Sequence, residues 1–331
     1  MTILITGGAG FIGSHLAKEL HARGEDIILL DSFLDNYSLE LKVARQDALL
    51  GSTGLEVFRC DIANYQNLTR VLDNLNFDSI IHLAAQPGIR LETSQYSRYI
   101  SSNITAFSNI LQLAQDRHVT SLIYASSSSV YGNQISSSLR EESKDVLPVS
   151  FYGATKLANE ILARSFVKET NLRARGLRFF TVYGPWGRPD MAYFRILTSL
   201  QDGKPFTLYG TGEILRDFTY IDDVVSSIIQ LRHNLIEQPE GSHDIVNVGG
   251  GSSESLLALI RITEELTGKT LQIVEGEHDD RDVFKTLADK SYLEKLITPF
   301  AFTNLETGMR EVVKWGQDSN IASRLGRWVH T

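Results

Sequence analysis

The fold is decided by the run Thr2-Ile3-Leu4-Ile5-Thr6-Gly7-Gly8-Ala9-Gly10-Phe11-Ile12-Gly13. Its first five residues are typical of a β-strand, and the residues that follow it are typical of a helix to about Arg23. A glycine cluster alone is more often a simple turn, and the first gap here is one residue wider than in the usual dinucleotide fingerprint. Between a strand and a helix, however, such glycines let the backbone approach a pyrophosphate at the helix N-terminus. The run therefore predicts a dinucleotide-binding loop that includes Gly7, Gly10, Phe11, Ile12 and Gly13.

A carboxylate follows the second expected strand, Asp26–Leu30, at Asp31. It lies roughly 20 residues past the glycines, where an acidic side chain binds the ribose hydroxyls of a dinucleotide and repels a 2′-phosphate. The pattern favours NAD over NADP as the cofactor. An Asp that only caps a helix would look the same in the sequence.

Strands and helices alternate from residue 2 to residue 180. After the first two strands, we expect strands at Leu55–Cys60, Ser79–Leu83, Thr120–Ser126 and Arg173–Phe180, and helices that include Ile100–Leu113 and Ala154–Phe166. This alternation indicates an α/β fold with a doubly wound, parallel, Rossmann-like sheet.

Several residues beyond these strands are candidates for cofactor contacts. Asp61 and Ile62 follow the third strand and are candidates to contact adenine. A small-residue turn that starts at Leu83, Ala84 and Ala85 is expected beside the cofactor. Asn103 interrupts the apolar pattern of a helix, and a buried Asn at such a position is usually a satisfied core amide.

The candidate for catalysis lies between Tyr124 and Lys156. A hydroxyl cluster that includes Ser127 ends an apolar strand, and Tyr152 opens a helix that carries Lys156 one turn later. A free phenol has a pKa of about 10, which a neighbouring cation lowers by favouring the phenolate. The serine hydroxyl can share the proton with the phenol and a substrate oxygen. An exposed Tyr–Lys pair would look the same, but beside the serines and the glycine loop it predicts catalysis.

The pattern changes after Phe180, where turn residues become frequent. A chain of 331 residues suggests about two domains. We expect a cofactor-binding domain at residues 1–180, to which a segment at about 219–250 returns. Residues 181–218 and 251–331 would form a smaller α/β domain for the substrate, with the site in the cleft between the two.

Composition excludes several classes of function. The net charge is −8 without a basic block, so a nucleic-acid partner is not expected. The single cysteine, Cys60, suits a reducing compartment, and the first expected strand begins so early that no room remains for a signal peptide. No apolar run approaches the roughly 18 residues of a membrane span. We therefore expect a soluble cytoplasmic protein. No metal site is predicted, although the acidic loop Glu275–Asp282 with His278 could imitate one.

These motifs resemble those of the extended short-chain dehydrogenase/reductase family, over essentially the whole chain. The residues that carry the resemblance are Gly7–Gly13, Asp31, Asn103, Ser127, Tyr152 and Lys156. Within that family the chain resembles the nucleotide-sugar epimerases, and most closely the UDP-glucuronate 4-epimerases. This narrower match rests on Gln86–Arg90, Tyr183–Ala192 and Gly210–Asp223. One departure is Glu277–Val283, where the family usually has a Gln-Pro-Gly-Asp-Val-like run, so a nucleotide contact from that loop is in doubt.

The resemblance implies a role for each matching residue. Tyr152 would be the base, Lys156 would lower its pKa and bind the nicotinamide ribose, and Ser127 would bridge to O4 of the sugar. The substrate-binding residues would be Arg90, Ser128, Ser129, Thr181, Arg188 and Arg216, with Arg216 at the UDP pyrophosphate and Ser128, Ser129, Thr181 and Arg188 around the C6 carboxylate. Arg188 could instead pair only with Asp190.

The implied reaction is inversion at C4 through a transient 4-keto sugar, with NAD as the cofactor and a homodimer as the assembly. The same Tyr, Lys and Ser would serve a UDP-glucose/UDP-galactose 4-epimerase. A UDP-glucuronate decarboxylase is less expected, because related decarboxylases and dehydratases usually carry an acidic residue before Val130-Tyr-Gly. A non-catalytic dinucleotide sensor of the same fold is a further alternative, which the intact Tyr152–Lys156 pair opposes.

Overall fold

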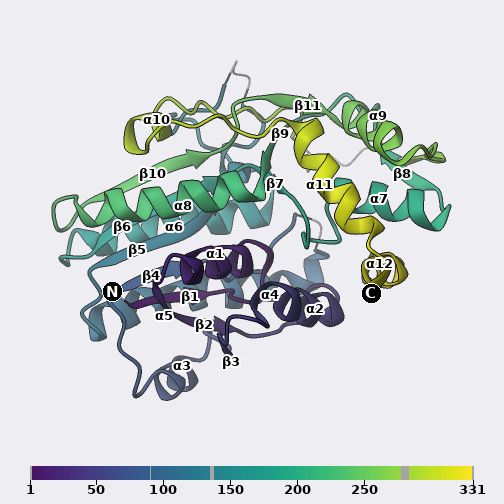
Figure 1. Cartoon of the computed structure of the whole chain (residues 1–331). Helices are drawn as coiled ribbons and strands as arrows, with labels where there is room; N and C mark the ends of the chain where they lie inside the picture. Colours follow the sequence, from purple (N-terminus) through teal and green to yellow (C-terminus); the bar gives the residue numbers. More distant parts are fainter. Residues whose placement is uncertain (1, 90, 135–137, 277–282, 330–331) are drawn as a thin grey trace.

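A computed structural model describes residues 2–89, 91–134, 138–276 and 283–329. Its centre is a seven-stranded parallel sheet in the order β10-β6-β5-β4-β1-β2-β3 (Figure 1). The strands are β1 (Thr2–Thr6), β2 (Asp26–Asp31), β3 (Val57–Arg59), β4 (Ser79–His82), β5 (Ser121–Ser127), β6 (Arg173–Phe179) and β10 (His243–Val248). The expected doubly wound parallel sheet is confirmed, and β10, which lies within the segment at about 219–250, joins it beside β6.

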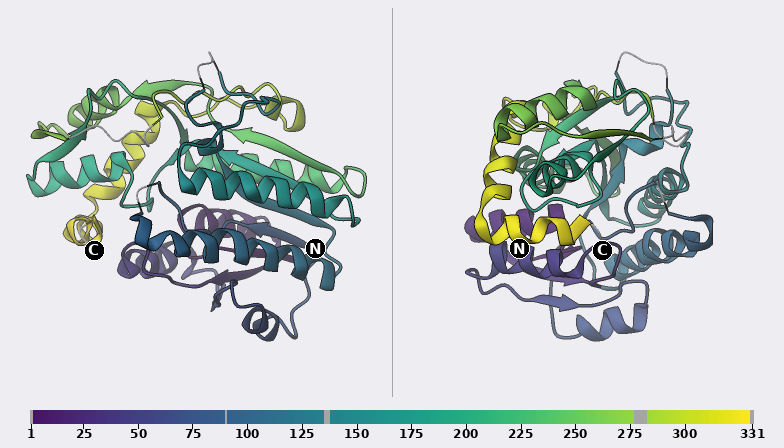
Figure 2. Two further views of the ribbon diagram at one scale, coloured as in Figure 1. Left: turned by 180° about the vertical axis from the view of Figure 1, so that it is seen from behind. Right: turned by 90° about the vertical axis from the view of Figure 1, so that its right-hand side faces the viewer.

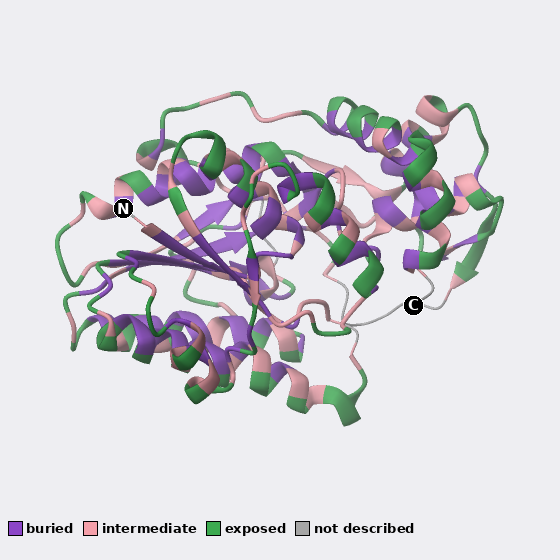
Figure 3. Cartoon of the chain, turned by 60° about the horizontal axis from the view of Figure 1, so that its bottom comes forward, coloured by how far each residue is buried: buried purple, intermediate pink, exposed green. Residues whose placement is uncertain are grey.

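The sheet is buried on both faces, as its apolar strands require. Successive residues of β1 enter opposite cores: Ile3 and Ile5 pack in one apolar cluster with Leu16, whereas Leu4 packs in another with Phe107. The central strands β1, β4, β5 and β6 are accordingly buried along most of their length, and many exposed residues lie on the outer faces of the helices (Figure 3).

Helices cover the two faces of this sheet. The helices α1 (Phe11–Ala22), α2 (Leu39–Leu50) and α8 (Ile221–Ile236) lie on one face. On the other face lie α5 (Ala106–Asp116) and α6 (Phe151–Val167), which run side by side in the view from behind (Figure 2). The short helix α3 (Tyr65–Val71) follows β3.

The rest of the chain builds two small sheets and further helices beside the carboxyl ends of the large sheet. One sheet has the order β11-β9-β7 and the other pairs β12 with β8. The strands of these two sheets are β7 (Thr181–Tyr183), β8 (Phe206–Tyr209), β9 (Leu215–Tyr220), β11 (Ser253–Ser255) and β12 (Ile273–Gly276). The helices of this part of the chain are α7 (Ala192–Asp202), α9 (Leu256–Thr267), α10 (Leu293–Leu296), α11 (Leu305–Gln317) and α12 (Ser319–Val329).

Two expectations about helices need correction. The helix expected at Ile100–Leu113 is not continuous: α4 (Tyr96–Tyr99) leads into a π-helical segment, η2 (Ile100–Thr105), and only then into α5. The helix α6 begins three residues before the expected Ala154. Its inner face is mostly polar, with Lys156 and Glu160 buried, while the apolar Ile161 is 62% exposed. Among the described residues, no helix has both the length and the apolar character that crossing a membrane requires.

Candidate active site

A cavity of about 570 Å³ lies at the carboxyl ends of the central strands, between the large sheet and the smaller one. It brings together most of the residues expected at the site. Those that line it are Gly7, Gly10, Phe11, Ile12, Gly13, Asp31, Leu83, Ala84, Ala85, Ser127, Ser128, Ser129, Tyr152, Lys156, Thr181, Arg188 and Arg216.

The glycine loop is packed so closely that side chains cannot replace its hydrogens. A Cβ atom at Gly13 would lie 2.1 Å from the carbonyl oxygen of Gly7, and one at Gly10 would lie 2.9 Å from the same oxygen. Gly7 has a φ of +76°, which L side chains rarely adopt. Gly10 caps α1 without a side-chain hydrogen bond, so the first N–H groups of the helix face an open cradle. The shape and the dipole of this cradle fit a pyrophosphate.

Asp31 ends β2 at the edge of this cradle. Its Oδ2 accepts a hydrogen bond of 3.1 Å from the backbone N–H of Ala9, and its Oδ1 accepts one of 2.8 Å from that of Phe33. The carboxylate is buried and lines the cavity, as the ribose-binding interpretation requires. Lys42, a buried cation that the sequence did not draw attention to, also lines this end of the cavity.

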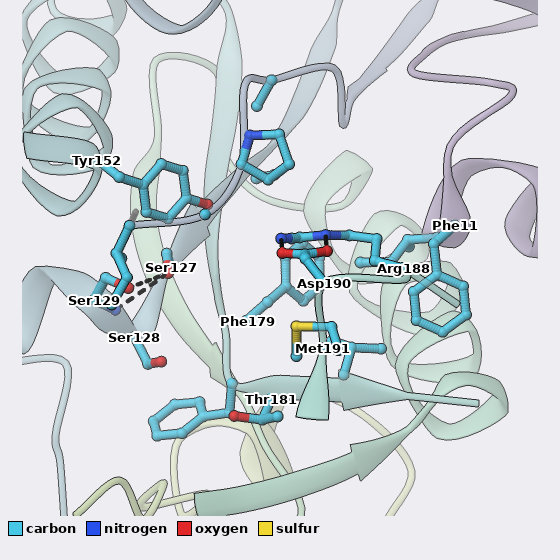
Figure 4. Close-up of a pocket in the computed structure, with 18 of the residues that line it drawn as sticks. Phe11, Ser127, Ser128, Ser129, Tyr152, Phe179, Thr181, Arg188, Asp190 and Met191 are labelled. Carbon is cyan, nitrogen blue, oxygen red and sulfur yellow. Dashed lines mark hydrogen bonds and ion pairs between the residues drawn. The ribbon is translucent and has the colours of Figure 1, made fainter. Parts of the chain in front are cut away.

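The catalytic candidates come from β5 and α6. Ser127 ends β5; its hydroxyl accepts a hydrogen bond from the backbone N–H of Ser129 at 3.1 Å and donates one to the hydroxyl of Ser129. A Cβ atom at Gly153 would lie 2.6 Å from the carbonyl oxygen of Ser129, so this glycine allows α6 to start against the serines. The phenol of Tyr152 consequently lies beside Ser127 (Figure 4).

Lys156 lies one turn further along α6 and is almost fully buried. Its Nζ donates a hydrogen bond of 3.0 Å to the carbonyl oxygen of Ala125 and lies 5.9 Å from the centre of the Tyr152 ring. Burial lowers the pKa of the ammonium to about 8. The amine is thus near the phenol but is held by a backbone carbonyl.

The pKa of the Tyr152 phenol is raised above its ordinary value, chiefly by burial. The charge of Arg188 and the hydroxyl of Ser127 act in the opposite direction. We expected Lys156 to be the main cation acting on this phenol, whereas in the structure Arg188 is the cation that most lowers its pKa. The effect of Lys156 on the phenol stays a prediction.

A buried ion pair lies one turn beyond Lys156 on the same face of α6. Glu160 accepts two hydrogen bonds from the Arg178 guanidinium of β6, at 2.9 and 2.7 Å, and a third from the hydroxyl of Ser126. The Arg178 guanidinium also lies over the ring of Tyr131, 4.6 Å from its centre. These contacts fix α6 against β5, one residue from Ser127, and breaking such a buried pair costs about 3–5 kcal/mol.

Arg188 lies across the cavity from Tyr152 and the serines (Figure 4). Its guanidinium is paired with the carboxylate of Asp190 through two hydrogen bonds, one of 3.0 Å from Nε. The pairing that the sequence left open is therefore present, although both side chains line the cavity. Thr181, at the start of β7, lies on a third side of the same space.

The far end of the cavity is formed by the second part of the chain. Arg216, on β9, lines it and donates a hydrogen bond to the carbonyl oxygen of Leu215. Sequence reasoning missed Arg195 and Phe206, whose guanidinium and ring lie 5.5 Å apart in the same wall. The available signal was a charged residue inside the otherwise apolar pattern of α7.

Three expected site residues within the described ranges do not line the cavity. Asp61 is exposed and accepts a hydrogen bond from the N–H of Ala63, and Ile62 is buried in an apolar cluster, so an adenine contact by either stays a prediction. Asn103 is fully buried, and its amide bonds both backbone groups of Gln86 and the hydroxyl of Thr155. It matches the satisfied core amide and fixes the turn beside the cavity from behind. Arg90 lies outside the described residues.

The loop that departs from the family pattern also lies mostly outside the described residues, including His278. Within the described ranges, no group of three or more His, Cys, Asp or Glu side chains could hold a metal ion.

The model of the NAD dependent epimerase/dehydratase family matches residues 3–249, a span that contains the glycine loop, the serines and the Tyr–Lys pair. The chain belongs to this family. The matched residues include the large sheet, β9 with the helix that follows it, and most of the residues that line the cavity.

Similar proteins in this family extend over nearly the whole chain. A UDP-glucuronate 4-epimerase of Thermodesulfobacterium geofontis is 35% identical, over 96% of this chain and 96% of its own. The structure of UDP-glucuronic acid 4-epimerase from Bacillus cereus in complex with UDP-glucuronic acid and NAD is 32% identical, with a TM-score of 0.86 over 95% of this chain and 98% of that one. MoeE5 in complex with UDP-glucose and NAD is 33% identical, with a TM-score of 0.83 over 97% and 100% of the two chains.

Proposed function

We propose that this protein is an NAD-dependent 4-epimerase that interconverts UDP-glucuronate and UDP-galacturonate through a transient 4-keto sugar. The observation that carries the proposal is one cavity that is lined by Tyr152, Lys156, three consecutive serines and Arg188. Within it, the Tyr152 phenol lies beside the serines and across from the Arg188 guanidinium. Tyr152 and Lys156 suit oxidation at a sugar hydroxyl, and the serine hydroxyls and Arg188 suit a neighbouring carboxylate. Relatives named as UDP-glucuronate 4-epimerases support the choice of substrate.

The cofactor would rest on the glycine loop, with its pyrophosphate at the N-terminus of α1 and a ribose at Asp31. The close packing at Gly10 and Gly13 supports this placement, because it leaves a cradle that a side chain would fill. Bound NAD supplies a reversible hydride acceptor for C4 of the sugar.

The side chains manage the proton and the orientation of the sugar. Tyr152 would take the proton of the C4 hydroxyl and return it after the flat 4-keto sugar has turned over. Ser127 would hold the C4 oxygen beside the phenol, and Lys156 would stabilise the phenolate and bind the nicotinamide ribose. Because Arg188 also favours the phenolate, the sugar-binding loop would assist the same proton transfer.

The hydroxyls and Arg188 would hold the C6 carboxylate. Oxidation at C4 makes a β-keto acid. Such an acid loses carbon dioxide when the bond between C5 and the C6 carboxylate aligns with the π system of the C4 carbonyl. A cage of Ser128, Ser129, Thr181 and Arg188 would keep the carboxylate charged and out of that alignment. Hydrogen bonds to a charged group contribute roughly 1.5–3 kcal/mol each, so such a cage can select the acid.

The nucleotide would occupy the other end of the cavity, with its pyrophosphate at Arg216. We propose the matching division of the chain: residues 1–180 with the return segment at about 219–250 bind NAD, and residues 181–218 and 251–331 bind the nucleotide sugar. The placement of β10 in the large sheet supports this division. The protein would act in the cytoplasm, which suits its single, buried Cys60.

A neutral-sugar epimerase is the second candidate, because the Arg188–Asp190 pair has no net charge with which to attract an acid. The test is to incubate the purified protein separately with UDP-glucuronate and UDP-glucose and to identify the products by NMR. UDP-galacturonate supports the proposed function. Turnover of UDP-glucose alone favours the second candidate, a UDP-pentose indicates a decarboxylase, and no product from either sugar contradicts both epimerases.

A further inference from the structure

A cation on α2, Arg45, is fully buried outside the cavity, and all its hydrogen-bond partners are neutral. Its Nε donates to the carbonyl oxygen of Trp186 at 2.6 Å, and its Nη2 donates to that of Gly187 at 3.0 Å. Its Nη1 donates to the carbonyl oxygen of Ala9 and to the phenol of Tyr37, both at 2.9 Å. Burying a charge without a carboxylate is costly, so four well-placed acceptors are needed to offset it.

These acceptors belong to parts of the chain that are far apart in sequence. Ala9 lies within the glycine loop, between two glycines, and its N–H binds Asp31. Trp186 and Gly187 lie 141 and 142 positions beyond Arg45 and directly precede Arg188. One guanidinium therefore joins the loop that would hold the cofactor to the loop that would hold the sugar.

The second loop has a backbone that needs such a restraint. Trp186 has a φ of +60°, a conformation that costs a residue with a Cβ atom roughly 1 kcal/mol or more. A Cβ atom at Gly187 would lie 1.5 Å from the phenol oxygen of Tyr193, so the chain fits here only without a side chain. Strained positions of this kind persist where the surroundings fix them, and the Arg45 bond to the Trp186 carbonyl does so.

We propose that Arg45 is a positioning residue that couples cofactor binding to the assembly of the sugar site. Ordering of the glycine loop by NAD fixes the Ala9 carbonyl, which fixes Arg45 and, through it, the backbone that presents Arg188 to the cavity. Coupling between two sites is reciprocal, so UDP-glucuronate bound near Arg188 must also hold NAD more tightly. The inference rests on the proposed function, because it takes UDP-glucuronate as the ligand near Arg188.

Lysine cannot replace arginine in this arrangement. The four acceptors require donors spread over a planar fork, whereas a lysine ammonium is a single point with three donors. Arg45→Lys keeps the charge and loses the bridge. The matched control is Arg175→Lys on β6, because Arg175 is also buried and has several partners, among them Asp244 and the carbonyl of Leu231, but it contacts neither the glycine loop nor the loop that precedes Arg188.

The experiment measures the rate of NAD release from the holoenzyme with and without saturating UDP-glucuronate, in a Tyr152→Phe background that suppresses turnover. We expect UDP-glucuronate to slow NAD release at least fivefold in the parent, within the usual range of coupling between sites. In Arg45→Lys, the ratio of the NAD release rate without UDP-glucuronate to the rate with it should fall at least threefold. In Arg175→Lys the melting temperature should fall while the ratio stays at the parent's value.

Three results would overturn the inference: no effect of UDP-glucuronate on NAD release in the parent, an unchanged ratio in Arg45→Lys, or an equal fall in both arginine variants. If Arg45→Lys does not fold, Tyr37→Phe removes one of the four acceptors and should lower the ratio at least 1.5-fold, and an unchanged ratio there would count against Arg45. Epimerisation of UDP-glucuronate by the unmodified protein, which keeps Tyr152, is assayed alongside. Absence of product refutes the proposed function, whereas normal product with unchanged coupling refutes only the role of Arg45.

Discussion

Tyr152 is subject to opposing influences that a local motif does not reveal. Burial raises the pKa of its phenol, and the charge of Arg188, which the sequence places 36 positions away, lowers it. A base of this kind becomes effective only when further positive charge is close to it, which Lys156 is positioned to supply if it leaves the Ala125 carbonyl.

The first prediction concerns the base. Tyr152→Phe keeps the ring and removes the proton acceptor, so kcat should fall by roughly 10²–10⁴, the usual contribution of a positioned general base. Folding and NAD content should stay near those of the parent. Tyr131→Phe is a control, because it removes a buried phenol that bonds Asn247 and does not line the cavity. A Tyr152→Phe variant with more than half of the parental kcat would show that another residue is the base.

A second prediction concerns the carboxylate cage. Thr181→Ala or Arg188→Ala should lower kcat/KM for UDP-glucuronate roughly tenfold or more, since each lost hydrogen bond to a charged group is worth about 1.5–3 kcal/mol. Activity on UDP-glucose should fall less, and some UDP-pentose should form, because the β-keto acid is less restrained. NMR of the products from both sugars measures these effects. Asp190→Asn keeps Arg188 and an amide oxygen that can accept its hydrogen bond, but it removes the opposing negative charge, so it should strengthen the preference for the acid. An unchanged acid-over-neutral preference in both alanine variants would remove Thr181 and Arg188 from the carboxylate site.

A third prediction is a pH dependence that arises at His82. This side chain is buried at the end of β4 with its Nδ1 2.8 Å from the Thr6 hydroxyl, and burial lowers its pKa to about 3. The unfolded chain, with an ordinary histidine pKa near 6.5, binds more protons between these values. His82 therefore contributes stability that is fully present above about pH 6.5 and is lost as the pH falls towards 3.

Urea unfolding of the parent and of His82→Gln at several pH values between 4.5 and 7 checks this expectation. On acidification, the free energy of unfolding of the parent should fall more steeply than that of His82→Gln. The difference in slope should reach up to about 1.4 kcal/mol per pH unit between the two pKa values of His82. His21→Gln, at an exposed histidine, is the matched control. Equal slopes for the parent and His82→Gln would mean that His82 is not held neutral.

At the scale of elements, the parts that the sequence predicted are those whose signals are adjacent in the chain. The strand, glycine turn and helix of residues 2–22 are one continuous pattern, and Tyr152 and Lys156 are fixed relative to one another by a single helix, α6. The helix α12 also carried such a signal, with Ile321, Leu325 and Trp328 on one face, but it was not predicted.

What could not be predicted depends on contacts between distant segments. The inner face of α6 is polar because Glu160 pairs with Arg178, which lies 18 positions further along the chain on another element. The contacts of Arg45 with residues 186 and 187, and of Arg195 with Phe206, likewise exist only in the folded chain. Asn103 lies in the π-helical segment, where its amide binds the backbone of Gln86 and does not line the cavity, and apolar periodicity does not reveal that contact.

The fourth prediction concerns the junction of β2 and the glycine loop. Asp31→Ala removes the acceptor for the Ala9 N–H and for a ribose, so NAD should bind roughly tenfold or more weakly. The difference between the affinities for NAD and for NADP should become smaller, because the charge that repels a 2′-phosphate is gone and Lys42 remains. Asp31→Asn, which keeps hydrogen-bonding capacity without charge, separates the two effects. Titration of each variant with both cofactors is the measurement, and equal affinity of the unmodified protein for NAD and NADP would contradict the role of Asp31.

At the scale of the whole molecule, a helical face carries exposed apolar side chains that no other described part of the chain covers. Ile161 on α6 is 62% exposed, Ile100 is 45% exposed, and Phe151, where α6 begins, stacks on Tyr96 at 4.4 Å. These residues belong to α4, η2 and α6, which lie together on the side that faces the viewer in the left panel of Figure 2. Apolar patches of this kind on a folded chain often mark an interface between subunits.

The last prediction is that this face pairs with its own copy across a two-fold axis. Helices at these positions pair in that way in the short-chain dehydrogenase/reductase family that the sequence resembles, and a homodimer should sediment at twice the chain mass of 37.0 kDa. Ile161→Glu would bring two carboxylates to such an interface, and like charges there cost several kcal/mol, so the dimer dissociation constant should rise roughly 100-fold or more. Val43→Glu, at an exposed apolar position on α2 across the sheet, should not change it. Analytical ultracentrifugation at micromolar concentration measures all three proteins. A single-chain mass for the parent, or an Ile161→Glu variant that dimerises like Val43→Glu, would exclude this face as the interface.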